Sequence, residues 1–262
     1  MTKTKTLIKT TNILSLGAGV QSSTILFMVL HKIIKKPDYV IFADTGWEPK
    51  KVYQWLDFLI EKSTIQIHII KKGNIKLDTL SEGRSASLPF YLENGGKAMR
   101  QCTNDYKIKP ILKKTRDLIG IKRLSKYQKI RMWLGISIDE IQRMKKSNIN
   151  HVENYYPLIE QNMDRNDCVT WMKNNGYPEP PKSSCIGCPF HSSSYWNDMA
   201  ENNPQEFKEA VEFDENIRIG KLNYKQFLHY SRKPLKDINT CKDTKQTLWS
   251  EFTEECDGYC GI

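Results

Sequence analysis

The sequence predicts an α/β protein whose core is a doubly wound, parallel sheet. Short apolar runs alternate along the chain with amphipathic segments that are long enough for helices. The clearest run is continuously apolar, as expected of a parallel strand that is buried on both faces. Small or acidic residues follow several runs, at the sheet edge where such proteins bind ligands.

Four apolar runs are predicted as parallel strands in chain order. Each is short, and turn-forming residues follow several of them. The most apolar is Tyr39-Val40-Ile41-Phe42-Ala43, which contains no polar side chain except the tyrosine hydroxyl. The strands are expected at residues 12–16, 39–43, 65–70 and 130–136.

Amphipathic segments connect these strands and continue beyond them. In the first segment Ile25, Val29 and Ile33 recur at helical spacing and define one apolar face. Pro37 follows, and a proline interrupts helical hydrogen bonding. Helices are expected at 21–35, 49–62, 104–119, 164–175 and 203–219, with a further one that ends at Met144.

A change of composition near residue 150 divides the chain. Before it strands and helices alternate, whereas after it aromatic residues, prolines and cysteines dominate. We therefore expect an α/β core at 1–150 and a cysteine-rich extension of helices and loops at 151–262, packed on the core. Within the core, the polar and glycine-rich segment 72–101 is expected to form a long loop or lid.

The composition limits the classes of function. A hydrophobic content of 39% in 262 residues suits a globular fold, and no apolar stretch approaches the about 18 residues of a transmembrane helix. No signal-peptide core follows the N-terminal residues, so we expect a cytoplasmic protein without a membrane segment. The net charge of +10 favours anionic partners such as nucleotides or nucleic acids, although many of the lysines lie in scattered pairs that are typical of a solvated surface.

A loop of small residues separates the first strand from the first helix. Backbone N–H groups at a helix start carry partial positive charge, and glycines let a bound oxyanion approach them. No Gly-Lys-Ser/Thr follows, which excludes a Walker loop, and a third glycine of the dinucleotide fingerprint is lacking. An ordinary tight turn is the alternative. The candidate phosphate-binding residues are Ser15, Gly17, Gly19, Gln21, Ser22 and Ser23.

Other candidates lie after later strands. Asp44, with Thr45, ends the second strand and could coordinate Mg²⁺ or hold adenosine hydroxyls, or it could cap the helix at 49–62. Arg100, Lys107 and Arg143 could neutralise phosphate charge, although each alone could equally form a surface ion pair.

The cysteines indicate metal or redox chemistry. Seven cysteines in a cytoplasmic chain argue against a disulfide framework. Cys185 and Cys188 are separated by two residues in a turn, so that two thiolates could bind one metal. A pair of buried cysteines is the alternative. Zinc and a [4Fe–4S] cluster both accept four thiolates, so the spacing does not separate them.

Five segments, in order, resemble the phosphoadenylyl-sulfate (PAPS) reductase family and its PP-loop. Together they extend over residues 12–190. This resemblance implies the adenine nucleotide α-hydrolase-like fold with a five-stranded parallel sheet. The segments are the loop at 15–23, FADTGWE at 42–48, RQCT at 100–103 with Tyr106, Lys107, Ile108 and Pro110, GISIDE at 135–140 with Arg143, and Pro157-Leu158 with CIGCP at 185–189.

Some positions depart from the family's pattern. Gln21 stands at the usual PP-loop aspartate, Gln101 at one of the tandem cysteines and Ser137 at the arginine of Gly-Ile-Arg. Near the C-terminus, Cys260 lacks the preceding glutamate and final histidine of the reductase motif Glu-Cys-Gly-x-His. Binding of an adenine nucleotide is therefore better supported than reduction of a sulfonucleotide.

The resemblance also implies cofactors, partners and roles. ATP or a sulfonucleotide would bind with Mg²⁺ beside a [4Fe–4S] cluster, with zinc as the alternative. A thioredoxin-like reductant or a sulfur donor would be a partner. Cys102, Cys185 and Cys188 would hold the cluster, with Cys168 either as fourth ligand or as a core cysteine. The candidate catalytic residues are Asp44, Lys107, Arg143 and Cys260.

Two sulfur reactions and one non-enzymatic function follow as hypotheses. A PAPS reductase-like enzyme, either oxidoreductase or sulfurtransferase, would reduce a sulfonucleotide with a C-terminal thiolate or would transfer sulfur. The alternative is ATP-dependent thiolation of tRNA or DNA, which the basic charge favours. A zinc-stabilised nucleic-acid-binding protein would explain the cysteines and the charge, but not the glycine loop or Asp44.

Overall fold

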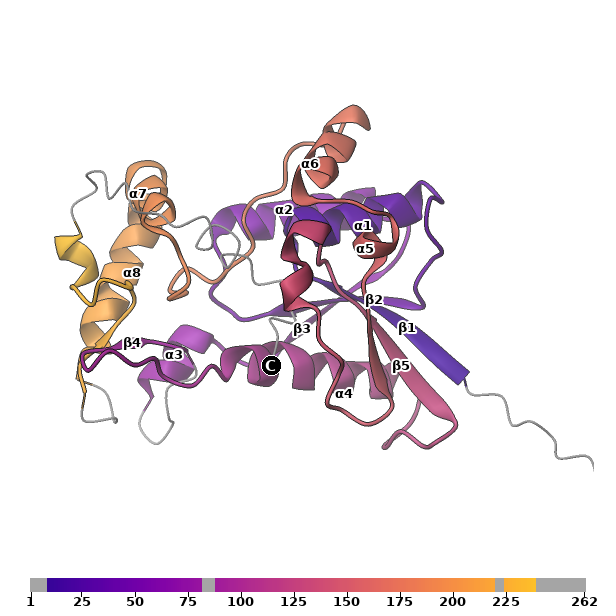
Figure 1. Ribbon diagram of the computed structural model, residues 1–262, viewed down its shortest axis with the longest axis horizontal. Helices are drawn as coiled ribbons and strands as arrows, with labels where there is room; N and C mark the ends of the chain where they lie inside the picture. The colour runs from indigo at the N-terminus through magenta and orange to yellow at the C-terminus, as the bar shows by residue number, and fades with distance from the viewer. Residues whose placement is uncertain (1–8, 82–87, 220–223, 239–262) are drawn as a thin grey trace, which may run out of the picture.

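A computed structural model describes residues 9–81, 88–219 and 224–238. Its core is a five-stranded parallel sheet in the order β3-β2-β1-β5-β6, with helices on both faces (Figure 1). The predicted α/β class, with its doubly wound, five-stranded parallel sheet, is confirmed. None of the helices in these ranges is long and apolar enough to cross a bilayer.

The sheet brings three strand ends to one edge. In the register of the sheet Leu16 pairs with Phe42, and Leu14 pairs with Trp133, so β1, β2 and β5 end close together. Ligands of parallel α/β sheets bind at this carboxyl edge. The strands are β1 (Lys9–Leu16), β2 (Tyr39–Asp44), β3 (Ile67–Lys71), β5 (Gln128–Trp133) and β6 (Val152–Tyr155).

The fifth strand, β6, lies outside the four predicted runs. Its sequence, Val-Glu-Asn-Tyr, is half polar because it is an edge strand that pairs only with β5. It comes from residues after 150, so the sheet takes one strand from the segment that was expected to form the extension.

Helices cover the sheet in two layers. Helices α1 (Val20–Leu30) and α2 (Lys50–Lys62) pack on the face that carries Leu14 and Phe42, whereas α4 (Lys109–Leu118) covers the face that carries Ile13 and Ile41 (Figure 1). The short α5 (Pro157–Glu160) and α6 (Arg165–Asn174) lie beside α1.

Several predicted helices differ in their bounds. Helix α1 ends at Leu30, not at 35, because Lys32 takes a left-handed conformation with φ of 61°. Ile33 is consequently exposed and not on an apolar helix face. The expected helix at 104–119 is a π-helix, η1 (Thr103–Ile108), followed by α4, with Pro110 in the first turn of α4 where its missing N–H costs nothing. The one ending near Met144 is a 3₁₀ helix, η2 (Ile138–Arg143).

The later residues build a second core beside the carboxyl edge. Its helices are α7 (Ser193–Asn202) and α8 (Pro204–Asn216), and Trp47 from the loop after β2 packs on Phe213 with ring centroids 4.7 Å apart. The segment at 72–101, which was expected to form a long loop or lid, contains a short helix and a short strand of this part. The smaller elements of this part are α3 (Ile75–Leu80), β4 (Tyr91–Leu92), β7 (Gln226–Phe227) and η3 (Leu235–Asp237).

Candidate functional site

The start of α1 is buried and has no cap. Its N-cap residue is Gly19, which has no side chain that could accept a hydrogen bond from the first turn. The N–H groups of Val20, Gln21 and Ser22 have no hydrogen-bond acceptor in the described ranges, although these residues are at most 1% exposed. Buried helix N–H groups need a partner, and an anion is the partner that the helix dipole favours.

The loop before α1 is fixed by its own hydrogen bonds. Gly17 N donates to Ser22 Oγ at 3.1 Å, and the Ser22 hydroxyl approaches Gly19 O at 3.4 Å. Ala18 takes a left-handed conformation with φ of 58°, which turns the chain from the strand into the helix. The Ser22 hydroxyl is thus used inside the loop, so the backbone is left as the main source of donors.

Ser15 differs from the other loop residues in its direction. Ile13 belongs to the core under α4, and strand alternation places Ser15 on that same side of the sheet, away from α1. Its buried hydroxyl has no hydrogen-bond partner in the described part of the chain. The structure therefore places Ser15 beneath the site on the opposite face from Ser22.

Gly135, which follows β5, touches the start of α1. An added Cβ at this position would lie 2.8 Å from Ser22 N and 3.2 Å from Gln21 Cβ. Contacts below 3.0 Å are not tolerated without movement, so only glycine lets the two loops meet. This close packing holds the first turn of α1 against the end of β5.

Buried polar side chains connect the same helix start to η2. Gln21 Nε2 donates to Glu140 Oε2 at 3.2 Å, and Arg165 Nη1 donates to Gln21 Oε1 at 3.4 Å. Glu140 is 3% exposed and also forms an ion pair with Arg143. Arg143 and Gln21 thus contact the same carboxylate, that of Glu140, and this carboxylate compensates the charge of the Arg143 guanidinium.

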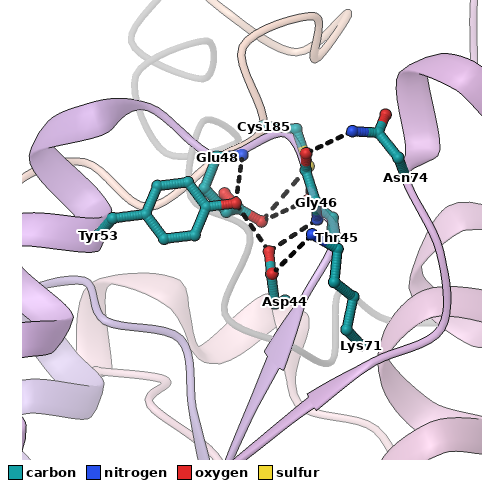
Figure 2. A network of polar contacts seen from close by, with 8 residues as sticks. All are labelled: Asp44, Thr45, Gly46, Glu48, Tyr53, Lys71, Asn74 and Cys185. Atoms are coloured by element: carbon teal, nitrogen blue, oxygen red, sulfur yellow. Dashed lines mark hydrogen bonds and ion pairs between the residues drawn. The ribbon is translucent and has the colours of Figure 1, made fainter.

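Asp44 is the centre of a polar network at the end of β2 (Figure 2). Its Oδ1 accepts hydrogen bonds from Gly46 N at 2.7 Å and from the Tyr53 hydroxyl at 2.8 Å, while Lys71 Nζ lies 3.4 Å from Oδ2. Burial, followed by the hydrogen bond to Asp44, raises the pKa of Tyr53 well above 10 and keeps it a donor.

Asp44 does not cap the helix that follows it. The N-cap residue of α2 is Pro49, and the N–H of Lys50 in the first turn donates to Glu206 Oε1 at 2.8 Å. The alternative role that the sequence left open is therefore absent from this arrangement. Asp44 instead fixes the turn at Gly46, whose φ of 76° and close contact with Gly73 O both require glycine.

The cysteine turn joins this network through Cys185. The Cys185 Sγ lies 3.1 Å from Thr45 Oγ1 and 3.6 Å from Glu48 Oε1 (Figure 2). The Thr45 hydroxyl donates to the same carboxylate oxygen at 2.7 Å. Glu48, which the sequence interpretation overlooked, is buried, so a carboxyl group and a thiol share one enclosed space at the sheet edge.

Trp47 and Gly187 hold the cysteine turn in place. Ile186 N donates to Trp47 O at 3.0 Å, and His191 Nε2 lies 2.9 Å from Cys185 O. A Cβ on Gly187 would come within 2.3 Å of two Trp47 ring carbons. The backbone of the turn therefore packs closely against the indole ring at Gly187, and the Cys185 side chain points toward Thr45.

The predicted cationic residues occupy different positions. Arg100 stacks on Phe190, with its Cζ 4.9 Å from the ring centroid, and so places positive charge beside the cysteine turn. Lys107 is buried on η1, which contacts β2. Both lie near the carboxyl edge, whereas Cys260 falls outside the described residues.

Cys168 is separate from the other described cysteines. It lies on α6 in the core cluster shared with α1 and is fully buried, whereas Cys185 belongs to the second core, against which Cys102 packs. Burial raises the pKa of the Cys168 thiol to about 12. Of the two roles that the sequence left open, the structure supports the core cysteine.

Replacing Cys168 by Ala should therefore act on stability alone. We expect a loss of about 1 kcal/mol in the free energy of unfolding, because one buried atom is removed from a packed site. Urea unfolding measures this loss, and metal analysis of the same preparation provides the control. A loss of bound iron or zinc in Cys168→Ala would contradict the assignment to the core.

The described residues do not assemble a complete metal centre. Within them, no three His, Cys, Asp or Glu side chains are grouped so that they could hold a metal ion. A four-thiolate cluster on Cys102, Cys168, Cys185 and Cys188 does not fit this arrangement, since Cys168 lies in the other core.

Comparisons with known proteins find distant likenesses among solved structures. No family model and no curated protein matches the chain. The chain is similar to the crystal structure of a PAPS reductase from Candida auris in a phosphate complex, with a TM-score of 0.43 and 17% identity over 68% of this chain and 76% of that one. It is also similar to the U34-tRNA thiolase NcsA from Methanococcus maripaludis with its [4Fe-4S] cluster, with a TM-score of 0.42 and 11% identity over 80% of this chain and 72% of that one.

The first of these structures bears the family name that the sequence motifs resemble. At such identities and TM-scores the likeness assigns no role to any residue of this chain. The roles proposed below therefore rest on the chain's own geometry.

Proposed function

We propose that the chain is an enzyme that binds an adenine nucleotide, ATP or a sulfonucleotide, by its phosphates at the start of α1. We further propose that sulfur chemistry takes place at the adjoining cysteine turn. The observation that carries the proposal is the uncapped, buried first turn of α1. It lies at the same sheet edge as Asp44, whose neighbour Thr45 contacts Cys185.

The geometry supports a division of labour among the residues. The N–H groups of Val20, Gln21 and Ser22 would donate hydrogen bonds to phosphate oxygens, as helix starts do in other nucleotide sites. Asp44 Oδ2, held near Lys71, would face nucleotide hydroxyls or the Mg²⁺ that accompanies ATP. Arg100 and Lys107 would offset the remaining phosphate charge.

Glu48 would serve the thiol. Its buried carboxylate lies within 3.6 Å of the Cys185 sulfur and could hold or accept a proton there. Thr45, hydrogen-bonded to Glu48, fixes the direction of that carboxylate. The Glu48 carboxylate would therefore accept the proton of the Cys185 thiol, and no metal takes part in this proton transfer.

A metal cofactor is not needed for this proposal. A [4Fe–4S] cluster would supply electron transfer or sulfide binding if Cys102, Cys185 and Cys188 held one, whereas zinc, which has no redox chemistry, would supply only thiolate or sulfide binding. Because the described arrangement does not fit a three-ligand centre, no step is assigned to that group. A thioredoxin-like reductant or a sulfur donor remains the proposed protein partner.

Two reactions are candidates for the site. Reduction of a sulfonucleotide would release sulfite, and its expected nucleophile, Cys260, lies outside the described residues. ATP-dependent thiolation of tRNA or DNA is the second candidate, and the net charge of +10 favours it. The two reactions share the nucleotide site and differ in the second substrate.

Calorimetric titration of the full chain with ATP and with PAPS tests the nucleotide site. Adenosine, which lacks phosphate, is the matched control. We expect binding of at least one of the two nucleotides, and at least about ten-fold weaker binding of adenosine, because the helix start recognises phosphate. Equal affinity for adenosine and both nucleotides would refute the phosphate site.

Product analysis of the same protein then separates the two reactions. Anaerobic incubation with PAPS and a dithiol should yield sulfite if the enzyme is a reductase. Incubation with ATP, sulfide and either bulk tRNA or DNA should yield AMP and sulfur-containing nucleic acid if it is a thiolase. Absence of all these products despite nucleotide binding would refute the proposed sulfur chemistry.

A further inference from the structure

A basic groove lies beside the nucleotide site, between β3 and α4. It is a cavity of about 530 Å³. Two aspartates, Asp105 and Asp117, also line it, so the ionised groups around it carry a net charge of +3. We call it the lysine groove after the five lysines that line it, namely Lys71, Lys72, Lys109, Lys113 and Lys114.

The lysine groove begins at the candidate site. Lys71, the last residue of β3, has its Nζ 3.4 Å from Asp44 Oδ2 and so belongs to both (Figure 2). From there the groove follows α4, which runs along the sheet under β3 (Figure 1). A molecule in the groove would therefore have one end at the carboxyl edge where the nucleotide is proposed to bind.

The charge of the groove is only partly compensated. Lys109 pairs with Asp105 at 2.9 Å, and Lys72 lies over the Tyr106 ring at 5.1 Å from its centroid. Lys113 and Lys114 have no ion-pair partner in the described part of the chain. Burial lowers the pKa of His68, and the charge of Lys114 adds to this effect.

The spacing of the lysines suits a repeating anion. Lys109 and Lys113 are one helical turn apart, so they stand on the same face of α4 at about 6 Å from each other. Lys71 lies at the end of the groove beside Asp44, and the lysines of α4 follow along that helix. The positive charges therefore form a row and do not converge on one point. A single phosphate would meet one or two of them, whereas a polymer of phosphates would meet them in succession.

We propose that the lysine groove binds the phosphodiester backbone of a nucleic acid strand. The strand would lead one of its nucleotides to the site between α1 and the cysteine turn. This inference rests on the proposed function, since it names the second substrate of that site as a nucleic acid. An acidic protein segment would lack evenly spaced phosphates, and it would become the alternative occupant if the test below finds no binding of nucleic acid by the wild type.

The test uses the full chain, bulk tRNA and a charge reversal in the groove. In K113E/K114E we expect at least about ten-fold weaker filter binding of tRNA at low salt, because each lysine lost removes a phosphate contact. The slope of log affinity against log salt should become shallower by about 1.4 to 1.8 for two contacts.

The matched control is K35E/K36E, which makes the same change of charge at an adjacent exposed pair. These lysines precede β2 and so lie at the opposite edge of the sheet. Its tRNA affinity should stay within about two-fold of the wild type, since residues outside the groove carry no specific phosphate contact. Calorimetry with ATP on both variants checks that the nucleotide site is unchanged.

Three results would overturn the inference. They are undetectable binding of tRNA and of duplex or single-stranded DNA by the wild type, equal losses in the two variants, and tRNA affinity that does not change with salt. If ATP binds normally in that case, the lysine groove proposal alone has failed. If neither ATP nor PAPS binds the wild-type chain, the proposed function has failed.

Discussion

Gly135→Ala should weaken ATP binding at least about ten-fold, which corresponds to about 1.4 kcal/mol. The new Cβ would lie 2.8 Å from Ser22 N. Because the position of a Cβ is fixed by its own backbone and Ser22 N is itself a backbone atom, the clash can be relieved only if the first turn of α1 moves. The N–H groups of Val20 and Ser22 would then leave the positions that phosphate oxygens require. Calorimetry with ATP measures the loss.

The control for this substitution is Gly96→Ala. Its Cβ would lie 3.4 Å from Asn94 Oδ1 on an exposed turn, where the side chain can yield. We expect Gly96→Ala to bind ATP with unchanged affinity. Urea unfolding of Gly135→Ala should show a free energy of unfolding lower by about 1 to 3 kcal/mol, because the new methyl group overpacks the site. ATP affinity in Gly135→Ala that equals the wild type would refute the role given to α1.

Gly187→Ala should destabilise the protein by about 3 kcal/mol. Its Cβ would lie 2.3 Å from two ring carbons of Trp47, which is itself buried against Phe213 and has no room to withdraw. The cysteine turn must then lift from the ring, which breaks the Ile186–Trp47 hydrogen bond and moves Cys185 away from Thr45. Urea unfolding measures the cost.

A double-mutant cycle tests the cause of this loss. Trp47→Leu removes the ring carbons that obstruct the new methyl group, so Gly187→Ala should cost about 1 to 2 kcal/mol less in that background. Equal costs in both backgrounds would show that the clash with the ring is not what destabilises the turn.

The sequence allowed the sheet to be predicted most clearly at its strand β2, which is a continuous apolar run. The run at 39–43 is buried between two helical layers, and burial on both faces requires continuous apolar residues. Edge strand β6 was not located, since only Val152 is apolar and buried among its residues and polar side chains face solvent. Edge strand β3 was located, by contrast, because three of its five residues are isoleucines.

Helix bounds depended on conformations that residue type does not specify. Lys32 adopts a φ of 61° in this fold. Because this position holds neither glycine nor proline, the sequence does not indicate that α1 ends here. The π-helix η1 was predicted as part of one regular helix, because Pro110 falls in the first turn of α4 and does not interrupt the path.

The candidate site was predicted in part. Sequence motifs identified the loop before α1, Asp44 and the Cys185 turn, because each follows a strand or contains closely spaced chemistry. Glu48 and Glu140 were missed as partners, since their contacts with Cys185 and Gln21 join residues more than 100 positions apart. Trp47 was quoted only as part of a motif, and its contact with Gly187 is likewise visible only in three dimensions.

Amide NMR of the uniformly ¹⁵N-labelled chain during ATP titration tests the central claim most directly, because it observes the N–H groups themselves. The account predicts that the amides of Val20, Gln21 and Ser22 shift most and move downfield as they bind phosphate, whereas adenosine leaves them near their initial positions. Saturating ATP that shifts other amides and leaves these three unchanged would contradict the claim.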